Sequence, residues 1–177
     1  MDNRDRARRI KMILMDVDGT LTDGTIFVFP DGEEVKGYNV RDGMGMLMAR
    51  LAGLYTGIIT GKTSKALEKR AERLRVNEIY QGILDKKPVL ETTKAKYGLQ
   101  NQEIGYIGDD LGDLSVIKTI GFAGAVADAH PEILRHSHFI SHHEGGRGAV
   151  REFIEFILEA QNLPWDILEK KIAMLKG

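Results

Sequence analysis

Short apolar runs alternate with amphipathic stretches along the chain. The apolar runs predict strands over residues 10–17, 54–60, 78–81, 104–107, 122–127 and 139–140. Hydrophobic positions at helical spacing predict helices over residues 44–51, 64–74, 87–97, 111–120, 131–135 and 149–160. Strands that alternate with helices are typical of a parallel sheet covered on both faces. The pattern therefore predicts a three-layer α/β fold, with residues 1–177 forming a single domain.

Two segments fall outside this alternation. Residues 26–29 and 34–38 read as two strands joined by Pro30-Asp31-Gly32-Glu33, which predicts a β-hairpin over residues 26–38. Such a hairpin needs an apolar partner surface, so the unbroken apolar run 26–29 predicts an interface. The tail, residues 162–177, carries Leu163, Ile167, Leu168, Ile172 and Leu175 at near-helical spacing. It is either a helix that packs on the core or a segment that docks on a neighbouring subunit.

Polar residues follow several of the predicted strands. Asp16, Asp18, Thr60, Asp109 and Asp110 all stand at strand ends. In parallel sheets ligands bind beyond the carboxyl ends of the strands, so these side chains are expected on one edge. Two carboxylates as close as those of Asp16 and Asp18 require a cation or a proton between them. Oxygen ligands favour Mg²⁺.

Composition removes several function classes. The formal net charge of −1 gives no reason to expect a nucleic-acid partner, and no apolar run approaches the ~20 residues that span a bilayer. The chain has no cysteine, which excludes disulfides and thiolate metal sites and fits a cytoplasmic protein. A zinc site remains an alternative at the histidines, which are His136, His138, His142 and His143. The N-terminal arginines are expected in a solvated tail, with an anion-binding arm as the alternative.

Four motifs, in order and each at a strand end, resemble the signature of the haloacid dehalogenase superfamily. They are Asp16-Val17-Asp18-Gly19-Thr20-Leu21-Thr22, Thr60-Gly61, the lone Lys86, and Gly108-Asp109-Asp110-Leu111-Gly112-Asp113. The resemblance implies a Rossmann-like fold and a Mg²⁺-dependent phosphatase. The segments 24–42 and 61–86 have room for a hairpin and for one helix and one strand, so the protein is expected to have no cap domain.

The resemblance also implies roles for the motif residues. Asp16 is the expected nucleophile, and Asp18 is the expected general acid and base. Mg²⁺ is expected to bind the side chains of Asp16 and Asp109 and the backbone carbonyl of Asp18. Thr60 is expected to bind a phosphate oxygen and Lys86 to neutralise charge. Asp110 and Asp113 stand behind them, where Asp113 either holds Lys86 or joins Asp110 in the outer shell of the metal.

Further segments narrow the resemblance to the family of 3-deoxy-D-manno-octulosonate 8-phosphate phosphatases. They include Asp23-Gly24, Asn39-Val40-Arg41-Asp42-Gly43, Tyr80-Gln81-Gly82, Val126-Ala127-Asp128-Ala129-His130-Pro131 and Gly145-Gly146-Arg147-Gly148. This family acts in lipopolysaccharide biosynthesis and is homotetrameric, with active sites shared between subunits. The resemblance thus implies a sugar phosphate substrate and a homotetramer. Gly61, Lys62, Arg41 and Arg147 are the candidates for binding the substrate.

Three alternatives remain at this point. A sister family removes phosphate from nine-carbon keto-deoxy sugar acids, and the position of Lys62 usually holds Arg in the octulosonate enzymes and Glu in that family. A phosphoacceptor receiver module would place its acidic pair on the first strand and its phosphoacceptor on the third. Here Asp16 and Asp18 both follow the first strand and Asp109-Asp110 come late, so the order argues against a receiver. A catalytically silent oligomerisation domain of the same fold would lack an acidic motif residue, and none is missing here.

Overall fold

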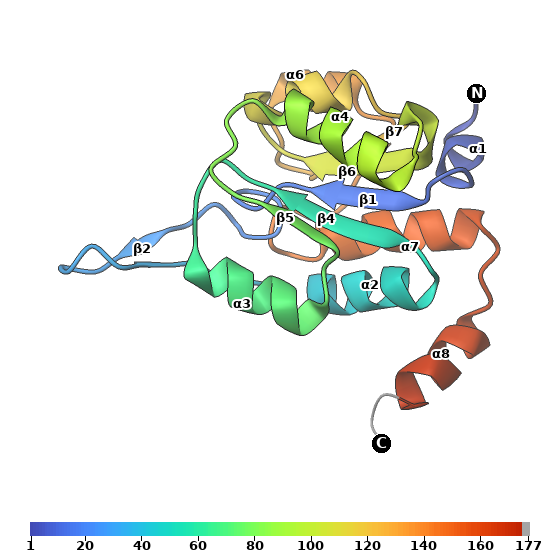
Figure 1. The fold of residues 1–177 in the computed structure, drawn as a ribbon, viewed down its shortest axis with the longest axis horizontal. Coiled ribbons are helices and arrows are strands. Elements are labelled where there is room, and N and C mark those ends of the chain that lie inside the picture. The colour runs from blue at the N-terminus through green and yellow to red at the C-terminus, as the bar shows by residue number, and fades with distance from the viewer. Residues whose placement is uncertain (175–177) are drawn as a thin grey trace.

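The computed structural model of the protein describes residues 1–174 (Figure 1). Within these residues, six strands form a parallel sheet in the order β5-β4-β1-β6-β7-β8. Their bounds are β1 Met12–Met15, β4 Tyr55–Ile59, β5 Glu78–Tyr80, β6 Ile104–Gly108, β7 Phe122–Ala125 and β8 Phe139–Ile140. The predicted parallel sheet is confirmed, although most of the strands are shorter than the apolar runs that predicted them.

Helices cover both faces of the sheet, as the alternating pattern predicted (Figure 1). One face carries α2 (Val40–Leu51), α3 (Lys65–Leu74) and α7 (Ala149–Ala160). The other carries α4 (Lys86–Tyr97), α5 (Leu114–Ile117) and α6 (Pro131–His136). Two 3₁₀ helices, η1 (Asn101–Glu103) and η2 (Leu111–Asp113), lie in the loops on either side of β6.

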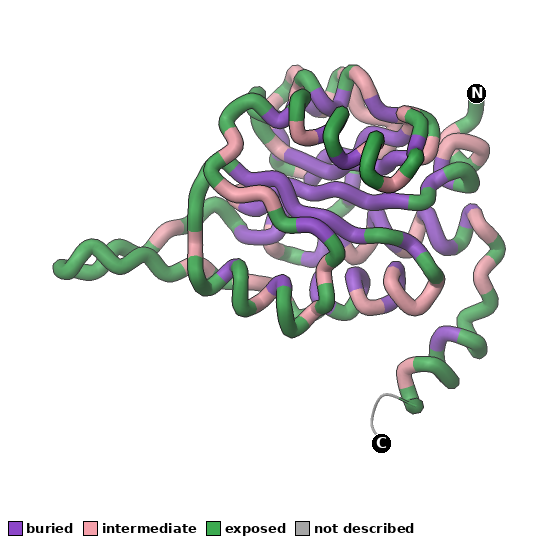
Figure 2. Tube along the Cα trace, in the orientation of Figure 1, coloured by how far each residue is buried: buried purple, intermediate pink, exposed green. Residues whose placement is uncertain are grey.

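β1 lies at the centre because its side chains suit burial on both faces. Residues 12–15 are all buried, and the strand pairs with β4 on one side and β6 on the other. The order of the strands reverses at β1, since the chain runs outward to β5 and then returns to β6. Such a switch point is where open α/β sheets bind their ligands. Figure 2 shows the buried strands as one continuous layer.

Aromatic side chains and glycines set the spacing between α7 and the sheet. Phe153 of α7 stacks on Phe122 of β7 with ring centroids 5.2 Å apart. A Cβ on Gly124 would lie 2.7 Å from the Phe153 ring, so only glycine admits the ring at this depth. Close packing of this kind fixes the position of α7 on the sheet.

Side chains move two helix boundaries away from their predicted positions. α2 begins at Val40 rather than at residue 44, because the side chain of Asn39 accepts the backbone N–H of Arg41 and caps the helix. The helix predicted over residues 111–120 is split into η2 and the short α5. Its first turn is the tighter 3₁₀ helix because the carboxylates of Asp110 and Asp113 accept hydrogen bonds from backbone N–H groups there.

The predicted hairpin is present and extends away from the sheet (Figure 1). β2 (Phe27–Val28) pairs antiparallel with β3 (Glu34–Val35), with Phe27 opposite Val35. The hairpin strands are exposed, which Figure 2 shows as an unbroken exposed segment. The apolar side chains of the hairpin are therefore not covered by the rest of the described chain.

Both ends of the described chain pack on the fold. The expectation of a solvated N-terminal tail was wrong, because α1 (Asn3–Ala7) buries Ala7, and Arg6 and Arg8 donate to the backbone carbonyls of Gly121 and Ala160. α8 (Trp165–Met174) buries Leu168 and packs near α2. Of the two readings of the tail, this favours a helix that packs on the core; Leu175 lies outside the described residues.

Among the helices of residues 1–174, none combines the length and the apolar character that crossing a membrane requires.

Candidate active site

Three neighbouring strands bring the predicted site residues to one edge of the sheet. Asp16 follows β1, Thr60 follows β4 and Asp109 follows β6. The sheet hydrogen bonds continue into these positions, since Asp16 N–H donates to Ile107 O (3.1 Å) and Thr60 N–H donates to Tyr80 O (2.9 Å). These two bonds fix the backbone positions of Asp16 and Thr60.

Lys86 connects three other side chains of the site. It is the first residue of α4, and its buried Nζ lies 2.6 Å from Asp16 Oδ1 and 2.6 Å from Asp113 Oδ1. Its third contact is Tyr106 OH at 3.1 Å. Three donors and three partners leave the ammonium fully satisfied in a buried place. The weak motif that pointed to Lys86 thus leads to the residue that connects the first and last motifs.

Asp113 holds the other members of the site in place. Its Oδ1 accepts hydrogen bonds from Lys86 Nζ and from Tyr106 OH (2.5 Å). Its Oδ2 accepts the backbone N–H groups of Asp109 (3.0 Å) and Asp110 (3.4 Å). Both oxygens are used within the protein, so the geometry favours the first of its two predicted roles, holding Lys86. Tyr106 was not predicted from the sequence, where it is one apolar-run residue among others.

The electrostatics of the site show a surplus of negative charge. Burial raises the pKa of Asp16 to about 6, with Asp113 adding to the shift and Lys86 opposing it. Burial also raises the pKa of Asp109 to about 8, against a hydrogen bond from Thr20, with Asp16 contributing to the rise. Burial disfavours the charge on Lys86, yet Asp113 and Asp16 raise the pKa of its ammonium. The positive charge of Lys86 therefore does not offset the burial and mutual repulsion of the Asp16 and Asp109 carboxylates.

The residues present fit a divalent cation. Asp16, Asp109 and Asp113 each offer a carboxylate oxygen, and these atoms all lie within 4.8 Å of one another. Because Asp113 is already engaged, Asp16 and Asp109 are the two side chains available as ligands. Hard carboxylate oxygens are the donors that Mg²⁺ prefers. Among the described residues, no histidine takes part in such a cluster, which gives the zinc alternative no support.

Tight packing shapes the turn after β1. Gly19 has φ +89°, and a Cβ there would lie 2.1 Å from Asp109 Oδ2. A Cβ on Gly145 would lie 1.8 Å from Gly19 O, while Gly146 N–H donates to Thr20 O (2.9 Å). The glycines before α7 therefore support the turn by close contact with its backbone.

Asp18 has a partner that the sequence did not indicate. Lys36 Nζ lies 2.5 Å from Asp18 Oδ1, and the side chains are 6% and 26% exposed respectively. Lys36 follows directly after β3 of the hairpin, within the strand that the sequence predicted over residues 34–38. No motif or spacing in the sequence marks this lysine.

The candidates for substrate binding divide between two places. Gly61 and Lys62 line a cavity of about 620 Å³ together with Lys36, and Lys62 Nζ lies 3.8 Å from Glu34 Oε2. Arg41 lines a different cavity of about 350 Å³ beside His143.

The last two predicted residues lie at turns. Arg147 is exposed and pairs with Asp23 at 3.2 Å between Nη2 and Oδ2. Asp110 caps η2 by accepting the N–H of Leu111, so within this chain its side chain serves the backbone.

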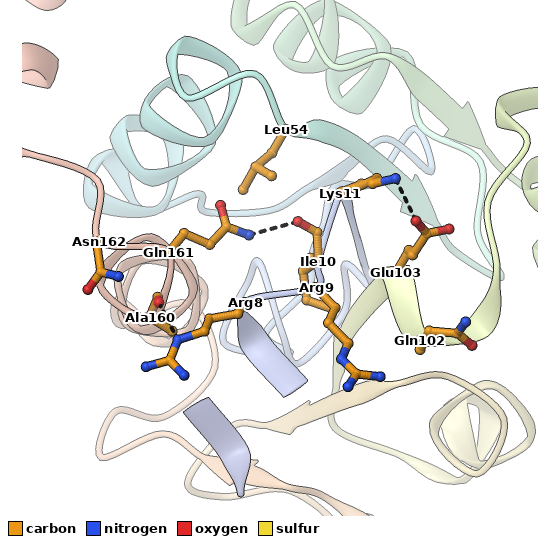
Figure 3. A pocket seen from close by; sticks show the side chains of 10 residues that line it. All are labelled: Arg8, Arg9, Ile10, Lys11, Leu54, Gln102, Glu103, Ala160, Gln161 and Asn162. Atoms are coloured by element: carbon orange, nitrogen blue, oxygen red, sulfur yellow. Dashed lines mark hydrogen bonds and ion pairs between the residues drawn. The ribbon is translucent and has the colours of Figure 1, made fainter. Parts of the chain in front are cut away.

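A larger cavity, of about 760 Å³, contains none of the predicted residues (Figure 3). It lies where the strands begin, against residues 8–11 and 160–162. Its polar groups bond to one another: Lys11 Nζ pairs with Glu103 Oε1 at 2.6 Å, and Gln161 Nε2 donates to Ile10 O at 2.7 Å. The cluster of carboxylates at the opposite edge is the place where reaction chemistry is available.

Comparison with known proteins agrees with this geometry. Residues 73–154 match the haloacid dehalogenase-like hydrolase family. The 3-deoxy-D-manno-octulosonate 8-phosphate phosphatase of Yersinia pestis is 43% identical over 157 residues, which are 89% of this chain and 84% of that protein. A crystal structure of the Yersinia pestis phosphatase superposes with a TM-score of 0.89 at 42% identity, covering 95% of this chain and 89% of that one.

A second solved structure contains bound groups. The 3-deoxy-D-manno-octulosonate 8-phosphate phosphatase of Moraxella catarrhalis, solved in complex with magnesium ion, phosphate ion and a KDO molecule, is 37% identical to this chain. Its TM-score is 0.90, with 98% of this chain and 97% of that chain covered. From the fold, the ordered motifs and these similarities, we conclude that the chain belongs to the haloacid dehalogenase-like hydrolases and, within them, to the 3-deoxy-D-manno-octulosonate 8-phosphate phosphatase family.

Proposed function

We propose that this protein is a Mg²⁺-dependent phosphatase that hydrolyses 3-deoxy-D-manno-octulosonate 8-phosphate to the free sugar acid and phosphate. The observation that carries the proposal is the placement of Asp16 beside Asp109, with Lys86 bonded to Asp16, at the carboxyl edge of the three central strands. The similarity to octulosonate phosphatases along most of the chain supports this choice of substrate.

Asp16 is the proposed nucleophile. Its carboxylate oxygen attacks phosphorus, the bond from phosphorus to the ester oxygen breaks, and an aspartyl phosphate forms on Asp16. Lys86, 2.6 Å from Asp16, neutralises charge on the carboxylate and then on the phosphoryl group. Thr60, buried at the end of β4, is the proposed donor to a phosphate oxygen. Mg²⁺, bound by the side chains of Asp16 and Asp109 and the backbone carbonyl of Asp18, supplies charge that lets an anionic nucleophile approach an anionic phosphate.

Asp18 is the proposed general acid and base. It gives a proton to the departing sugar oxygen in the first step, and takes a proton from the water that hydrolyses the aspartyl phosphate in the second. Proton transfer of this kind contributes about 10²–10⁴-fold to the rate. Asp113 takes no part in bond changes and keeps Lys86 and the backbone of Asp109 in place.

For the sugar acid, we propose Gly61 and Lys62 as binding residues, because they line a cavity together with Lys36, the ion-pair partner of Asp18. Lys62 offers a cation to the substrate carboxylate, although without the planar fork that an arginine provides. Arg41 and Arg147 lie outside this cavity and are proposed to reach the active site of a neighbouring subunit.

We propose a homotetramer in which the hairpin strands β2 and β3 pack around a symmetry axis. The support is the apolar, fully exposed hairpin, which needs a partner surface to be stable. Residues 1–177 are proposed to act as one domain without a cap, so that neighbouring subunits enclose the substrate. The proposed compartment is the cytoplasm, and a chain with no cysteine gains nothing from an oxidising one.

Hydrolysis of paired substrates tests the function. We expect kcat/KM to be higher for 3-deoxy-D-manno-octulosonate 8-phosphate than for the nine-carbon 9-phosphate, and activity to vanish with EDTA. Asp16→Asn should remove turnover and leave the circular dichroism spectrum unchanged, because an amide forms no phosphoenzyme. Asp166→Asn, an exposed aspartate in α8, is the matched control and should be fully active.

Each part of the proposal has an outcome that contradicts it. A higher kcat/KM for the nine-carbon substrate would move the assignment to the sister family. Full activity after chelation would rule out the metal, and substantial activity in Asp16→Asn would rule out the nucleophile.

A further inference from the structure

Lys36 connects the hairpin to the reaction centre. Its Nζ lies 2.5 Å from Asp18 Oδ1, and its side chain is only 6% exposed although the hairpin beside it stands in solvent. Lys36 also lines the cavity of about 620 Å³ that contains Gly61 and Lys62. The ammonium is thus placed between the carboxylate of Asp18 and the space available to the sugar.

A buried ammonium is costly unless a carboxylate compensates it. Removing an ion from water is costly, and only a well-placed partner of opposite charge offsets that cost. Among the described residues, Asp18 is the carboxylate paired with Lys36. A surface lysine with no task would stay in solvent, where its charge is hydrated and its side chain keeps its freedom. The burial of Lys36 therefore needs a reason in the active site.

We propose that Lys36 is a positioning residue that orients Asp18 for proton transfer. This inference rests on the proposed function, in which Asp18 protonates the departing oxygen. The Lys36 ammonium lies against Oδ1 in an ion pair, which leaves Oδ2 to carry the proton that passes to the ester oxygen as its bond to phosphorus breaks. In the second step a proton from water returns to the same carboxylate. Without Lys36, Asp18 rotates freely and reaches the departing oxygen less often.

This role predicts a dependence on the leaving group. A good leaving group departs as an anion and needs no proton, whereas a poor one depends on the acid. Substituted phenyl phosphates vary this property without changing the phosphoryl group. The parameter kcat/KM reports the steps up to formation of the phosphoenzyme, so it isolates the first proton transfer from the later hydrolysis.

The experiment measures kcat/KM of the full-length protein with Mg²⁺ on phenyl, 4-nitrophenyl and 2,4-dinitrophenyl phosphate. Lys36→Met should lower kcat/KM about 10- to 100-fold for phenyl phosphate, which is less than the ~10²–10⁴-fold value of the acid itself because Asp18 is still present. For 2,4-dinitrophenyl phosphate the change should stay within about threefold. Lys36→Arg, which keeps a cation for the carboxylate, should restore most of the loss.

Two controls separate positioning from other roles. Lys69→Met removes an exposed lysine of α3 that does not line this cavity, and kcat/KM should change little for all three substrates. In an Asp18→Asn background, Lys36→Met should add no further loss on phenyl phosphate, since the group that it orients no longer transfers a proton. If Lys36→Met is partly unfolded, the ratio of kcat/KM between phenyl and 2,4-dinitrophenyl phosphate still decides the matter, because the folded fraction cancels from it.

The result that would overturn the proposal is a uniform loss across the three leaving groups, or no loss at all. A uniform loss would mean that Lys36 binds the phosphoryl group or supports the fold. Failure of the wild-type protein to hydrolyse any of the phosphates would instead contradict the proposed function, so the two failures are distinguishable.

Discussion

At the scale of single residues, the site is built around charges that share partners. Lys86 serves Asp16 and Asp113 at equal distances of 2.6 Å, and Tyr106 bonds to both Lys86 and Asp113. All four side chains are buried or nearly so. In such a network the removal of one partner leaves an uncompensated charge in a place that water does not reach.

Asp113→Asn tests this network. The variant keeps the size of the side chain, but an amide NH₂ in place of Oδ2 cannot accept the backbone N–H groups of Asp109 and Asp110, so we expect a loss of about 1–3 kcal/mol in the free energy of unfolding. Phosphatase activity should fall with it, because the positions of Lys86 and Asp109 depend on Asp113. Urea unfolding and kcat/KM measure the two effects.

The matched control is Glu72→Gln, which breaks the exposed ion pair with Lys69 at 3.2 Å. Pairs exposed to solvent contribute little, so this variant should unfold at the wild-type urea concentration. If Asp113→Asn also unfolded at the wild-type urea concentration, the network would not stabilise the folded protein as expected.

Residue identity alone predicted part of this site. Asp16, Thr60 and Asp109 could be found because each ends an apolar run, and a parallel sheet gathers strand ends at one edge. Tyr106 and Lys36 could not, because their roles arise from contacts between distant segments. An aromatic residue in a buried strand and a lysine beside a hairpin have ordinary structural explanations in sequence.

At the scale of elements, the periodicity of the chain located every strand of the sheet and both ends of α7, but it missed the start of α2 and the break between η2 and α5. The ends depend on side chains that bond to backbone groups, as Asn39 does at α2 and Asp113 at η2. The N-terminal segment shows a related limit. Its arginines read as a solvated tail, yet Arg6 and Arg8 end at backbone carbonyls of the fold.

Strand β7 and the segment before β8 are joined by a bond that depends on pH. His138 Nδ1 accepts the backbone N–H of Ala123 at 2.9 Å, which requires a neutral ring nitrogen. Burial, together with the nearby charge of Arg6, lowers the pKa of His138 from its ordinary value. The folded state therefore binds this proton less readily than the unfolded state, whose pKa is about 6.5.

The sign of the effect follows from this difference. The contribution of His138 is complete above about pH 6.5 and is lost as the pH falls through the folded pKa. Between pH 7.5 and pH 5.5 we expect the urea midpoint of the wild type to fall relative to that of His138→Gln, because the glutamine side chain does not titrate. The raised pKa values of Asp16 and Asp109 act in the opposite direction but are common to both proteins, so they cancel from the difference. His136→Gln, on the neighbouring α6, is the control and should follow the wild type. A His138→Gln variant with the same pH dependence as the wild type would refute the assignment.

At the scale of the whole molecule, the exposed hairpin is the feature that bears on assembly. Phe27 is 63% exposed, Val28 67% and Phe29 49%, in β2 and at the start of the turn that follows it. The hairpin could be predicted from its turn, and its apolar run predicted an interface. The number of subunits cannot be derived from one chain, because the symmetry operator is not encoded in a local pattern.

The double variant Phe27→Asp and Phe29→Asp tests the assembly. Charges at a buried apolar contact should dissociate the proposed tetramer and raise KM for the sugar phosphate, while the circular dichroism spectrum stays unchanged. Sedimentation velocity reads the assembly state. Glu33→Lys changes the charge of the same hairpin without removing an apolar side chain and should remain assembled. A wild-type protein that sediments as a fully active monomer would contradict the proposal.

The docking of α8 has an optical consequence. The chain contains one tryptophan, Trp165, and it is the first residue of α8. Among the described residues of α8, Leu168 is the buried one, and Lys171 Nζ donates to Leu51 O at 2.7 Å. A helix held by so few contacts should detach from the rest of the fold before the sheet unfolds. Indole fluorescence should therefore change at a lower urea concentration than far-ultraviolet ellipticity, which makes Trp165 an intrinsic reporter of the release of this helix, readable without any added label.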